Sequence, residues 1–171
     1  MIKLKSFEQE NIIITWTAIK IGLYGYCNFA SQLENQDVLN YALELLEKDI
    51  NQNEDILALA ICYEENSEEI RSIVYKLSQY EDIDYYFEVR KWRALYLKEL
   101  LINLPKDFID GLYELTDFWA MFNYPEDSPH IVQGKNSNIS PQEYYSEENY
   151  ANIVNNHKTW LKEEFKKLKK A

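Results

Sequence analysis

The chain has 171 residues, of which 29 are acidic and 18 are basic, so its net charge is −11. A surface of that sign repels phosphate backbones, which argues against nucleic-acid binding and favours a basic protein as partner. Aromatic residues make up 15% of the chain while glycine and proline number 4 each, a composition that excludes disorder and a turn-rich all-β fold.

Candidate N-caps divide the first half of the chain into short helices. Ser6, followed by Gln9, predicts a capping box that opens a first helix. Thr15 is a candidate cap for the segment WTAIKIGLYGY, although the β-branched run from Ile12 to Thr15 is equally typical of a strand. Further helices are predicted to start at Asn35, Asn53 and Ser67, which precede apolar residues at helical spacing.

Longer helical patterns follow in the second half. Residues 84–104 are apolar around much of the helix, so we predict that this helix is central and that Pro105 ends it. Residues 106–122 carry an apolar stripe (Phe108, Leu112, Leu115, Trp119 and Phe122) opposite an acidic row (Asp107, Asp110, Glu114 and Asp117). Ser140 before Pro141 predicts another helix start, and Ser146 a second, with the last helix ending near Lys167.

The polar segment NYPEDSPHIVQGKNSNISPQEYYSEENY, residues 123–150, separates the last two of these helical patterns. It holds three of the four prolines. Long irregular segments of compact domains are usually either functional or disordered. Because the segment contains apolar and aromatic residues, we predict a packed loop at about 123–145; these residues are Tyr124, Ile131, Val132, Tyr144 and Tyr145.

The patterns together predict an all-α fold: a single compact domain, residues 1–171, of about six to eight helices in antiparallel pairs. Cys27 and Cys62 follow no CxxC spacing, so we expect two reduced, buried thiols. The N-terminus MIKLKSFEQE lacks the apolar core of a signal peptide, and the run Ile12–Ile14 is far too short for a membrane span. A cytoplasmic location without membrane contact is therefore expected.

A hydrolase site is one interpretation of the residues Asp127, Ser128 and His130. In it, His130 is the base, Ser128 the nucleophile and Asp127 the group that orients the base. Triads usually assemble from distant segments, however, and no nucleophile-elbow pattern is present. The alternative is that Asp127 and Ser128 cap a turn imposed by Pro125 and Pro129, and we prefer this interpretation.

A metal site would have to combine His130 and His157 with Asp127 or Glu126. None of the usual ligand spacings is present, so we predict neither a metal nor a cofactor. His157 lies on the apolar stripe of the last helix, a position typical of a packed histidine bonded to a backbone carbonyl.

The acidic row is the best candidate for a face that binds a protein partner, and the alternative, which the pattern alone favours, is a face that is simply solvated. The predicted partner-binding residues are Asp107, Asp110, Glu114, Asp117, Glu126, Asp127 and His130. The pairs Tyr85-Tyr86 and Tyr144-Tyr145 are candidate anchors or core residues. Arg90 and Arg93 could grip an anionic ligand, but we expect them to pair with acids or to lie on aromatic surface.

A family resemblance appears in the C-terminal half. The stretches DFWAMFNYPEDSPHIVQG, NISPQEYYSEENY and NHKTWLKEEF, with a weaker echo in ITWTAIKIGLYGY, resemble an uncharacterised bacterial family known as a domain of unknown function. The phrase YP-x-D-SPH-x-x-QG carries most of the likeness, which covers about Asp117 to Phe165. Small acidic families of this type often look like immunity proteins encoded beside bacterial toxins. The resemblance implies no catalytic residue.

The function predicted from these features is a non-catalytic cytoplasmic protein-binding domain, an immunity protein that occludes a basic toxin domain. Two alternatives stay open. One is a small hydrolase-like enzyme with a site in the 123–150 loop, and the other is a helical scaffold that works as an oligomer. The oligomeric state itself is not predicted.

Overall fold

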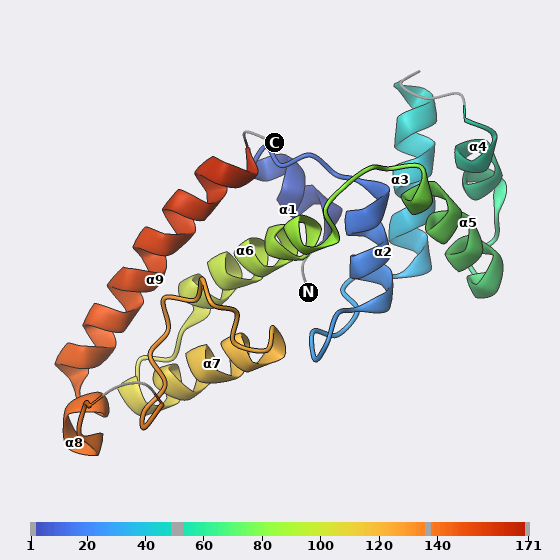
Figure 1. Ribbon diagram of the computed structural model, residues 1–171. Helices are drawn as coiled ribbons and strands as arrows, with labels where there is room; N and C mark the ends of the chain where they lie inside the picture. Colours follow the sequence, from blue (N-terminus) through green and yellow to red (C-terminus); the bar gives the residue numbers. More distant parts are fainter. Residues whose placement is uncertain (1–2, 49–52, 136–137, 170–171) are drawn as a thin grey trace. The chain divides into compact units, whose positions relative to one another are not determined.

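The computed structural model describes residues 3–48, 53–135 and 138–169, and these ranges contain nine helices and no strand (Figure 1). The all-α prediction is confirmed. The helices are α1 Leu4–Gln9, α2 Trp16–Tyr24, α3 Asn35–Glu47, α4 Glu54–Ile61, α5 Ser67–Gln79, α6 Tyr85–Asn103, α7 Phe108–Met121, α8 Pro141–Tyr144 and α9 Glu147–Leu168.

The helix starts follow local capping in most cases. The Thr15 side chain accepts a hydrogen bond from the Ala18 amide, and Asn53 does the same for Asp55. Ser140 and Ser146 cap α8 and α9 in the same way. The predicted start at Ser6 is wrong, because α1 begins at Leu4 and the Ser6 amide already bonds the Lys3 carbonyl.

The start of α3 differs by one residue from the prediction. Glu34, rather than Asn35, occupies the N-cap position, and its amide donates to the Asp37 carboxylate at 2.8 Å. The Asn35 side chain instead donates to the Glu64 carbonyl at 2.9 Å and to the Ser67 hydroxyl at 2.7 Å. The Asn35 side chain therefore contacts residues far along the chain instead of capping α3 locally as predicted.

The contacts divide the chain into two compact units, which we describe separately. Unit 1 comprises the described residues up to Tyr26 and those from Ala30 to Trp92, and unit 2 comprises residues 27–29 and those from Arg93 onward. Helix α6 contributes residues to both. The prediction of one domain stays a prediction.

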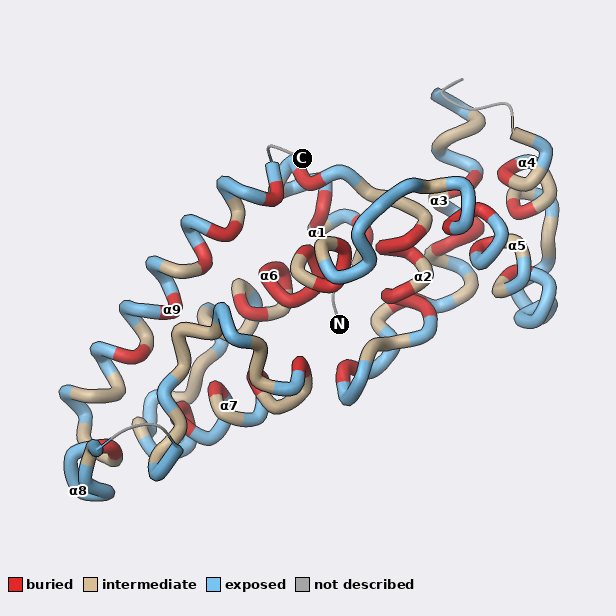
Figure 2. Tube along the Cα trace, in the orientation of Figure 1, coloured by how far each residue is buried: buried red, intermediate tan, exposed pale blue. Residues whose placement is uncertain are grey.

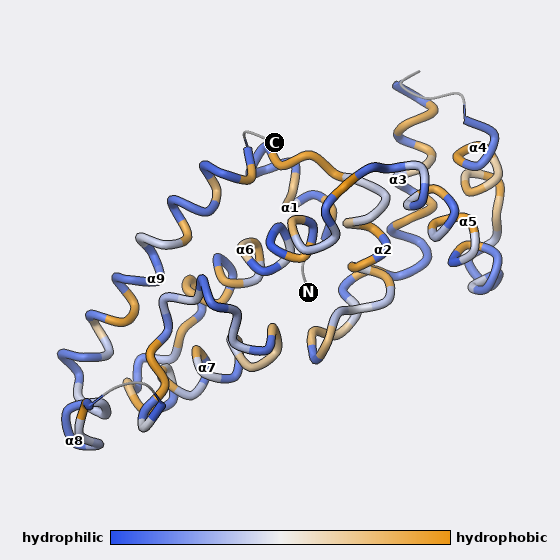
Figure 3. Tube along the Cα trace, in the orientation of Figure 1, coloured by the Kyte–Doolittle hydropathy of each residue, from blue (hydrophilic) through white to orange (hydrophobic). Residues whose placement is uncertain are grey.

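In unit 1, α2 packs against α5, and α4 packs against both α3 and α5. The core contains Phe7 edge-on to Trp92, with ring centroids 4.8 Å apart. Buried Glu88 and Lys91 form an ion pair of 2.8 Å; Glu88 also accepts from the Thr15 hydroxyl. The segment 12–15, ambiguous in sequence, is an extended link rather than a helix or strand, and it is apolar over Ile12–Ile14 (Figure 3).

In unit 2, α7 packs against α9, and α8 also contacts α9. Leu112, Leu115 and Trp119 are buried while Asp110 and Glu114 are exposed, as the two-sided pattern of α7 predicts (Figure 2).

Of the cysteines, Cys27 is exposed and Cys62 is half-buried, and both are free thiols. The prediction of buried cysteines is therefore wrong: Cys27 lies in an exposed turn after α2, and Cys62, the C-cap residue of α4, is only partly covered.

None of the helices in the described ranges has the length and apolar character that crossing a membrane requires.

Candidate functional site

The loop after α7 begins with two consecutive residues in the left-handed region. Asn123 has φ of 58° and Tyr124 has φ of 46°, and the Tyr124 amide returns to the Trp119 carbonyl at 2.9 Å. This conformation is common for asparagine and unusual for a bulky residue such as tyrosine. It turns the chain sharply at the end of α7, so that the following residues run back beside that helix (Figure 1).

Hydrogen bonds from side chains of α8 and α9 hold the described part of this loop in place. The Trp160 indole donates to the Asp127 carbonyl at 2.7 Å, and the Tyr144 hydroxyl donates to the Ile131 carbonyl at 3.0 Å. The loop is therefore packed, as predicted, in the residues that the structure describes. Residues 136 and 137 of the predicted loop lie outside them.

His130 lies half-buried against α7. Its Nε2 is 3.0 Å from the Thr116 hydroxyl, which itself donates to the Leu112 carbonyl at 2.8 Å. Because the hydroxyl proton is used there, Nε2–H of His130 donates and Nδ1 carries the lone pair. Within the described residues, the buried Nδ1 has no hydrogen-bond partner. Burial, and then the charge of His157, lower the pKa of His130 to about 3.

His157 is fully buried in α9, and both of its ring nitrogens are used. Nδ1 lies 2.7 Å from the Ile153 carbonyl, and Nε2 accepts from the Trp119 indole at 2.7 Å. This arrangement requires a proton on Nδ1 and none on Nε2. Burial lowers the pKa of His157, although the bond to the Ile153 carbonyl opposes that shift. The prediction of a packed histidine bonded to a backbone carbonyl matches this geometry.

Arg93 is the buried cation of unit 2. Its guanidinium donates to both carboxylate oxygens of Asp127, at 2.9 and 2.5 Å, and lies 3.6 Å from buried Glu164. It also lies over the rings of Trp119 and Trp160, 5.6 and 5.1 Å from their centroids. Arg93 thus does what we expected of it, pairing with acids and lying on aromatic surface.

The candidate triad does not form a hydrogen-bonded series in the described residues. Asp127 bonds Arg93, and the His130 ring bonds Thr116. The Ser128 hydroxyl accepts from the His130 backbone amide at 3.1 Å, and the Ser128 amide bonds the Pro125 carbonyl. These are the bonds of a capped turn. A cavity of about 250 Å³ is lined by Ser128 and His130 but not by Asp127.

One residue of the acidic row caps α7, and the other three do not. The Asp107 carboxylate caps the helix by accepting from the amides of Ile109 and Asp110, at 2.9 and 3.1 Å. The side chains of Asp110, Glu114 and Asp117 are exposed and form no ion pair with another described residue. Glu126 is also exposed and lies beside the His130 cavity.

An apolar strip lies beside these carboxylates. Tyr113 is 54% exposed and Ile109 is 39% exposed, one turn apart on α7. The Tyr113 ring lies 6.3 Å from that of Tyr145, and both residues line a cavity of about 120 Å³ with Tyr144 and Thr116. We call Ile109, Asp110, Tyr113, Glu114 and Asp117 the α7 face.

Ile109 and Tyr113 are the two residues of this face that the sequence analysis did not single out. Their signal is present in the sequence, because Ile109 and Tyr113 are spaced by four and fall outside the apolar stripe. Of the predicted anchors, Tyr144 is buried and Tyr145 is half-buried, whereas Tyr85 and Tyr86 of unit 1 are exposed. In the described ranges, no three His, Cys, Asp or Glu side chains are grouped so that they could hold a metal ion.

A comparison with protein families identifies a matching family. The model of a family described as an uncharacterized protein conserved in bacteria (DUF2247) matches residues 4–165. The match includes the middle of the chain, about residues 28–81, where the sequence motifs showed no resemblance. No curated protein and no solved structure matches the chain.

Proposed function

The chain belongs to this family of uncharacterised bacterial proteins, and we propose that it is a non-catalytic, cytoplasmic protein-binding domain whose α7 face contacts a basic partner. One observation carries the proposal: exposed Tyr113 lies beside three carboxylates that have no ion pair within the described residues. Exposed tyrosine next to uncompensated charge is typical of interfaces, where aromatic side chains supply buried contact and charges orient the partner.

The carboxylates of Asp110, Glu114 and Asp117 lie within two turns of one helix and repel each other modestly. A basic surface would relieve that repulsion. Because the net charge of the chain is −11, its long-range electric field attracts the same basic partner and raises the association rate.

A non-catalytic function agrees with the chemistry around His130. Its ring is engaged with Thr116, and its low pKa leaves it neutral and weakly basic near neutral pH. The Asp127 carboxylate forms an ion pair with buried Arg93, so it is not free to orient His130. The His130 side chain holds the loop to Thr116 of α7, and the Asp127 side chain holds it to Arg93 of α6.

The partner class that we favour is a toxin domain neutralised by occlusion. Its support is the chemistry of the face: a patch of aromatic and carboxylate groups fits a surface rich in lysine or arginine. A cation-lined active site, such as one that binds phosphate backbones, has that character, and an acidic protein seated over it excludes the substrate.

The charges of the α7 face are tested by reversing them. Asp110→Lys/Glu114→Lys and the control Glu47→Lys/Glu65→Lys change the net charge equally, the control at exposed positions of unit 1. Each protein is immobilised and exposed to host lysate at low salt. We expect wild type and control to retain the same basic protein, releasable by salt, and the α7 variant to lose it. The proposal fails if both variants lose it equally, or if nothing basic is retained.

The association and dissociation rates of the retained protein distinguish electrostatic steering from buried contact. Charge reversal on the α7 face should slow association by about tenfold or more, with a strong dependence on salt. Tyr113→Ala should leave the association rate nearly unchanged and speed dissociation, also by about tenfold or more, because it removes buried contact. Surface plasmon resonance measures both rates. An association rate independent of salt would contradict electrostatic steering.

The toxin interpretation has its own test. The retained protein is expressed alone and together with wild type or the α7 variant. We expect the retained protein to arrest growth when it is expressed alone. Wild type should relieve this arrest, and the Asp110→Lys/Glu114→Lys variant should not. A retained protein without effect on growth would leave a binding domain but exclude an immunity function against it.

A further inference from the structure

A cavity of about 120 Å³ lies at the edge of the α7 face, and Tyr113 belongs to both. Pockets for ordinary small-molecule ligands measure about 300–1,000 Å³, so this cavity is too small for such a ligand. An apolar cavity of about 150 Å³ takes up one benzene molecule, which has six carbons. A volume of about 120 Å³ therefore fits a group the size of a single aliphatic side chain.

The described residues that line this cavity carry no charge, and two of their hydroxyl groups are bonded within the fold. The Thr116 hydroxyl donates to the Leu112 carbonyl at 2.8 Å and lies 3.0 Å from the His130 ring. The Tyr144 hydroxyl donates to the Ile131 carbonyl at 3.0 Å. Since these polar groups already have partners, the lining favours an apolar occupant.

Three tyrosines form the aromatic part of the lining. The Tyr145 ring lies edge-on to that of Tyr144, with centroids 5.0 Å apart, and 6.3 Å from the ring of Tyr113. Tyr144 is buried, Tyr145 is half-buried and Tyr113 is exposed, so this aromatic surface extends from the interior of unit 2 to solvent. Val132 and Gln133 also line the cavity, and the uncharged Gln133 amide can bond the backbone of an entering chain.

Carboxylates flank Tyr113 along α7. Asp110 lies three residues before Tyr113 and Asp117 lies four residues after it, positions that share one side of a helix. At about 1.5 Å per residue, both are within roughly 6 Å of Tyr113 along the helix axis. Two lysines are near in sequence, Lys106 and Lys135, but neither lines the cavity or forms an ion pair with these carboxylates in the described residues. The approach to the cavity is therefore acidic.

We propose that this cavity receives one leucine or isoleucine side chain of the basic partner, and that lysine or arginine side chains beside it meet Asp110 and Asp117. This inference rests on the proposed function, because it names the chemistry by which the α7 face recognises its partner. Burial of the aliphatic group supplies affinity, and the flanking charges fix where it enters. A second copy of this chain would bring the same carboxylates and be repelled, so it is not the occupant.

Four pentapeptides with acetylated and amidated ends test the occupant: KALAK, KAAAK, KAWAK and EALAE. In KALAK, each lysine is two residues from the leucine, about 6–7 Å in an extended chain. The observables are the methyl signals of Leu112 and Val132, which line the cavity, in ¹H–¹³C spectra of the whole chain. KALAK should shift both signals saturably. Its leucine methyl groups should also show nuclear Overhauser effects to the rings of Tyr113 and Tyr145.

The other peptides separate a cavity from a flat apolar surface. KAAAK should bind at least about tenfold more weakly than KALAK, because three fewer carbons leave water. KAWAK should also bind more weakly than KALAK, since an indole is too large to enter, whereas on a flat surface the largest side chain would bind best. Equal binding of KALAK and KAAAK, tightest binding of KAWAK, or no methyl response to millimolar KALAK would each overturn the proposal.

Substitutions at Tyr145 test the lining without changing the α7 face. Tyr145→Ala should reduce the preference for KALAK over KAAAK to about threefold or less, because it removes one side of the cavity. Tyr145→Phe keeps the ring and should preserve the preference. Tyr63→Ala, at an exposed tyrosine of unit 1, is the matched control and should preserve it as well. A preference that is unchanged in Tyr145→Ala would contradict the assigned cavity.

The inference and the proposed function fail in different ways. EALAE should bind about threefold or more weakly than KALAK at low salt, and Asp110→Lys/Glu114→Lys should abolish that difference. If the charge preference appears but KAAAK binds as tightly as KALAK, the basic-partner function stands and the side-chain anchor is wrong. If EALAE binds as tightly as KALAK, the face does not select a basic partner, and both proposals lose the charges on which they rest.

Discussion

At the scale of single residues, two neutral histidines are central to unit 2. His157 accepts from the Trp119 indole, so a proton on its Nε2 would place two donors 2.7 Å apart. His130 lies beside it, with ring centroids 5.4 Å apart, so a charge on either histidine disfavours a charge on the other. Geometry and burial therefore act in the same direction, and both keep the pair uncharged.

The pH dependence of stability follows from the depressed pKa of His130, about 3 in the fold. In an unfolded chain a histidine titrates near pH 6.5, so the unfolded state binds more protons between about pH 3 and 6.5. The stabilisation is present above about pH 6.5 and is lost as the pH falls. Between pH 7.5 and 5.5, wild type should lose about 1 kcal/mol more of its free energy of unfolding than His130→Gln, which preserves a donor for Thr116.

Urea unfolding of both proteins at the two pH values measures this difference. The comparison isolates His130, because His157 and the carboxylates are present in both proteins. Equal losses in wild type and His130→Gln would contradict a neutral His130 in the fold.

At the scale of elements, the close approach of α2 and α6 depends on Gly22. A Cβ atom on Gly22 would lie 2.4 Å from Cζ2 of Trp92 and 2.7 Å from Leu33. Trp92 cannot move easily, since it is fully buried and its indole donates to the Ala18 carbonyl at 2.8 Å. Helix α2 thus needs a glycine for packing, although glycine weakens helices.

Gly22→Ala should therefore destabilise the protein by about 1–3 kcal/mol, as overpacking of a core does, despite the better helix propensity of alanine. Thermal or urea unfolding measures the change. A double-mutant cycle with Trp92→Phe is the control, because the smaller ring makes room for the methyl group and should reduce the cost of the alanine. A cost that is the same in the Trp92→Phe background would mean that the clash lies elsewhere.

At the scale of the whole molecule, the two units share helix α6, which supplies core residues to both. We expect them to unfold as one domain, because breaking α6 in either unit removes buried side chains from the other. Native-state hydrogen exchange in increasing denaturant measures this: the slowest amides of α5 and α9 should converge on a single free energy of unfolding. Two distinct free energies would show that the units are separate domains.

Much of the helical structure follows from the sequence alone. The pattern over 84–104 corresponds to α6 at Tyr85–Asn103, and that over 106–122 to α7 at Phe108–Met121. These predictions succeed because helical periodicity and capping by Thr15, Asn53 or Ser140 depend on neighbours within about one turn. The exposed acids Asp110, Glu114 and Asp117 were recognisable for the same reason, since they lie opposite the apolar stripe.

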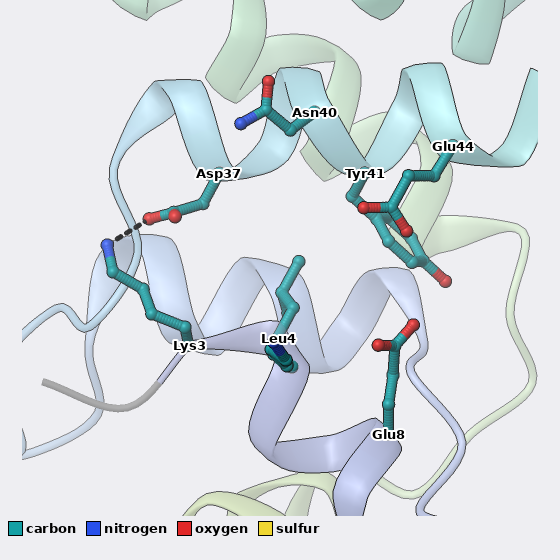
Figure 4. Close-up of a pocket in the computed structure, with 8 residues that line it drawn as sticks. Lys3, Leu4, Glu8, Asp37, Asn40, Tyr41 and Glu44 are labelled. Atoms are coloured by element: carbon teal, nitrogen blue, oxygen red, sulfur yellow. Dashed lines mark hydrogen bonds and ion pairs between the residues drawn. The ribbon is translucent and has the colours of Figure 1, made fainter.

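The site itself depends on contacts that local patterns do not contain. Arg93 and Asp127 are 34 positions apart and meet only because the chain turns back after α7. Asp127, offered by the sequence as a surface or catalytic acid, is bound to a buried cation for that reason. Likewise, Glu8 and Glu44 line one cavity only because side chains of α1 and α3 come together in the fold (Figure 4). The sequence by itself determined the helices and the charged face, because these arise from neighbouring residues; the tertiary structure decided which side chains meet, because packing joins residues distant in the chain.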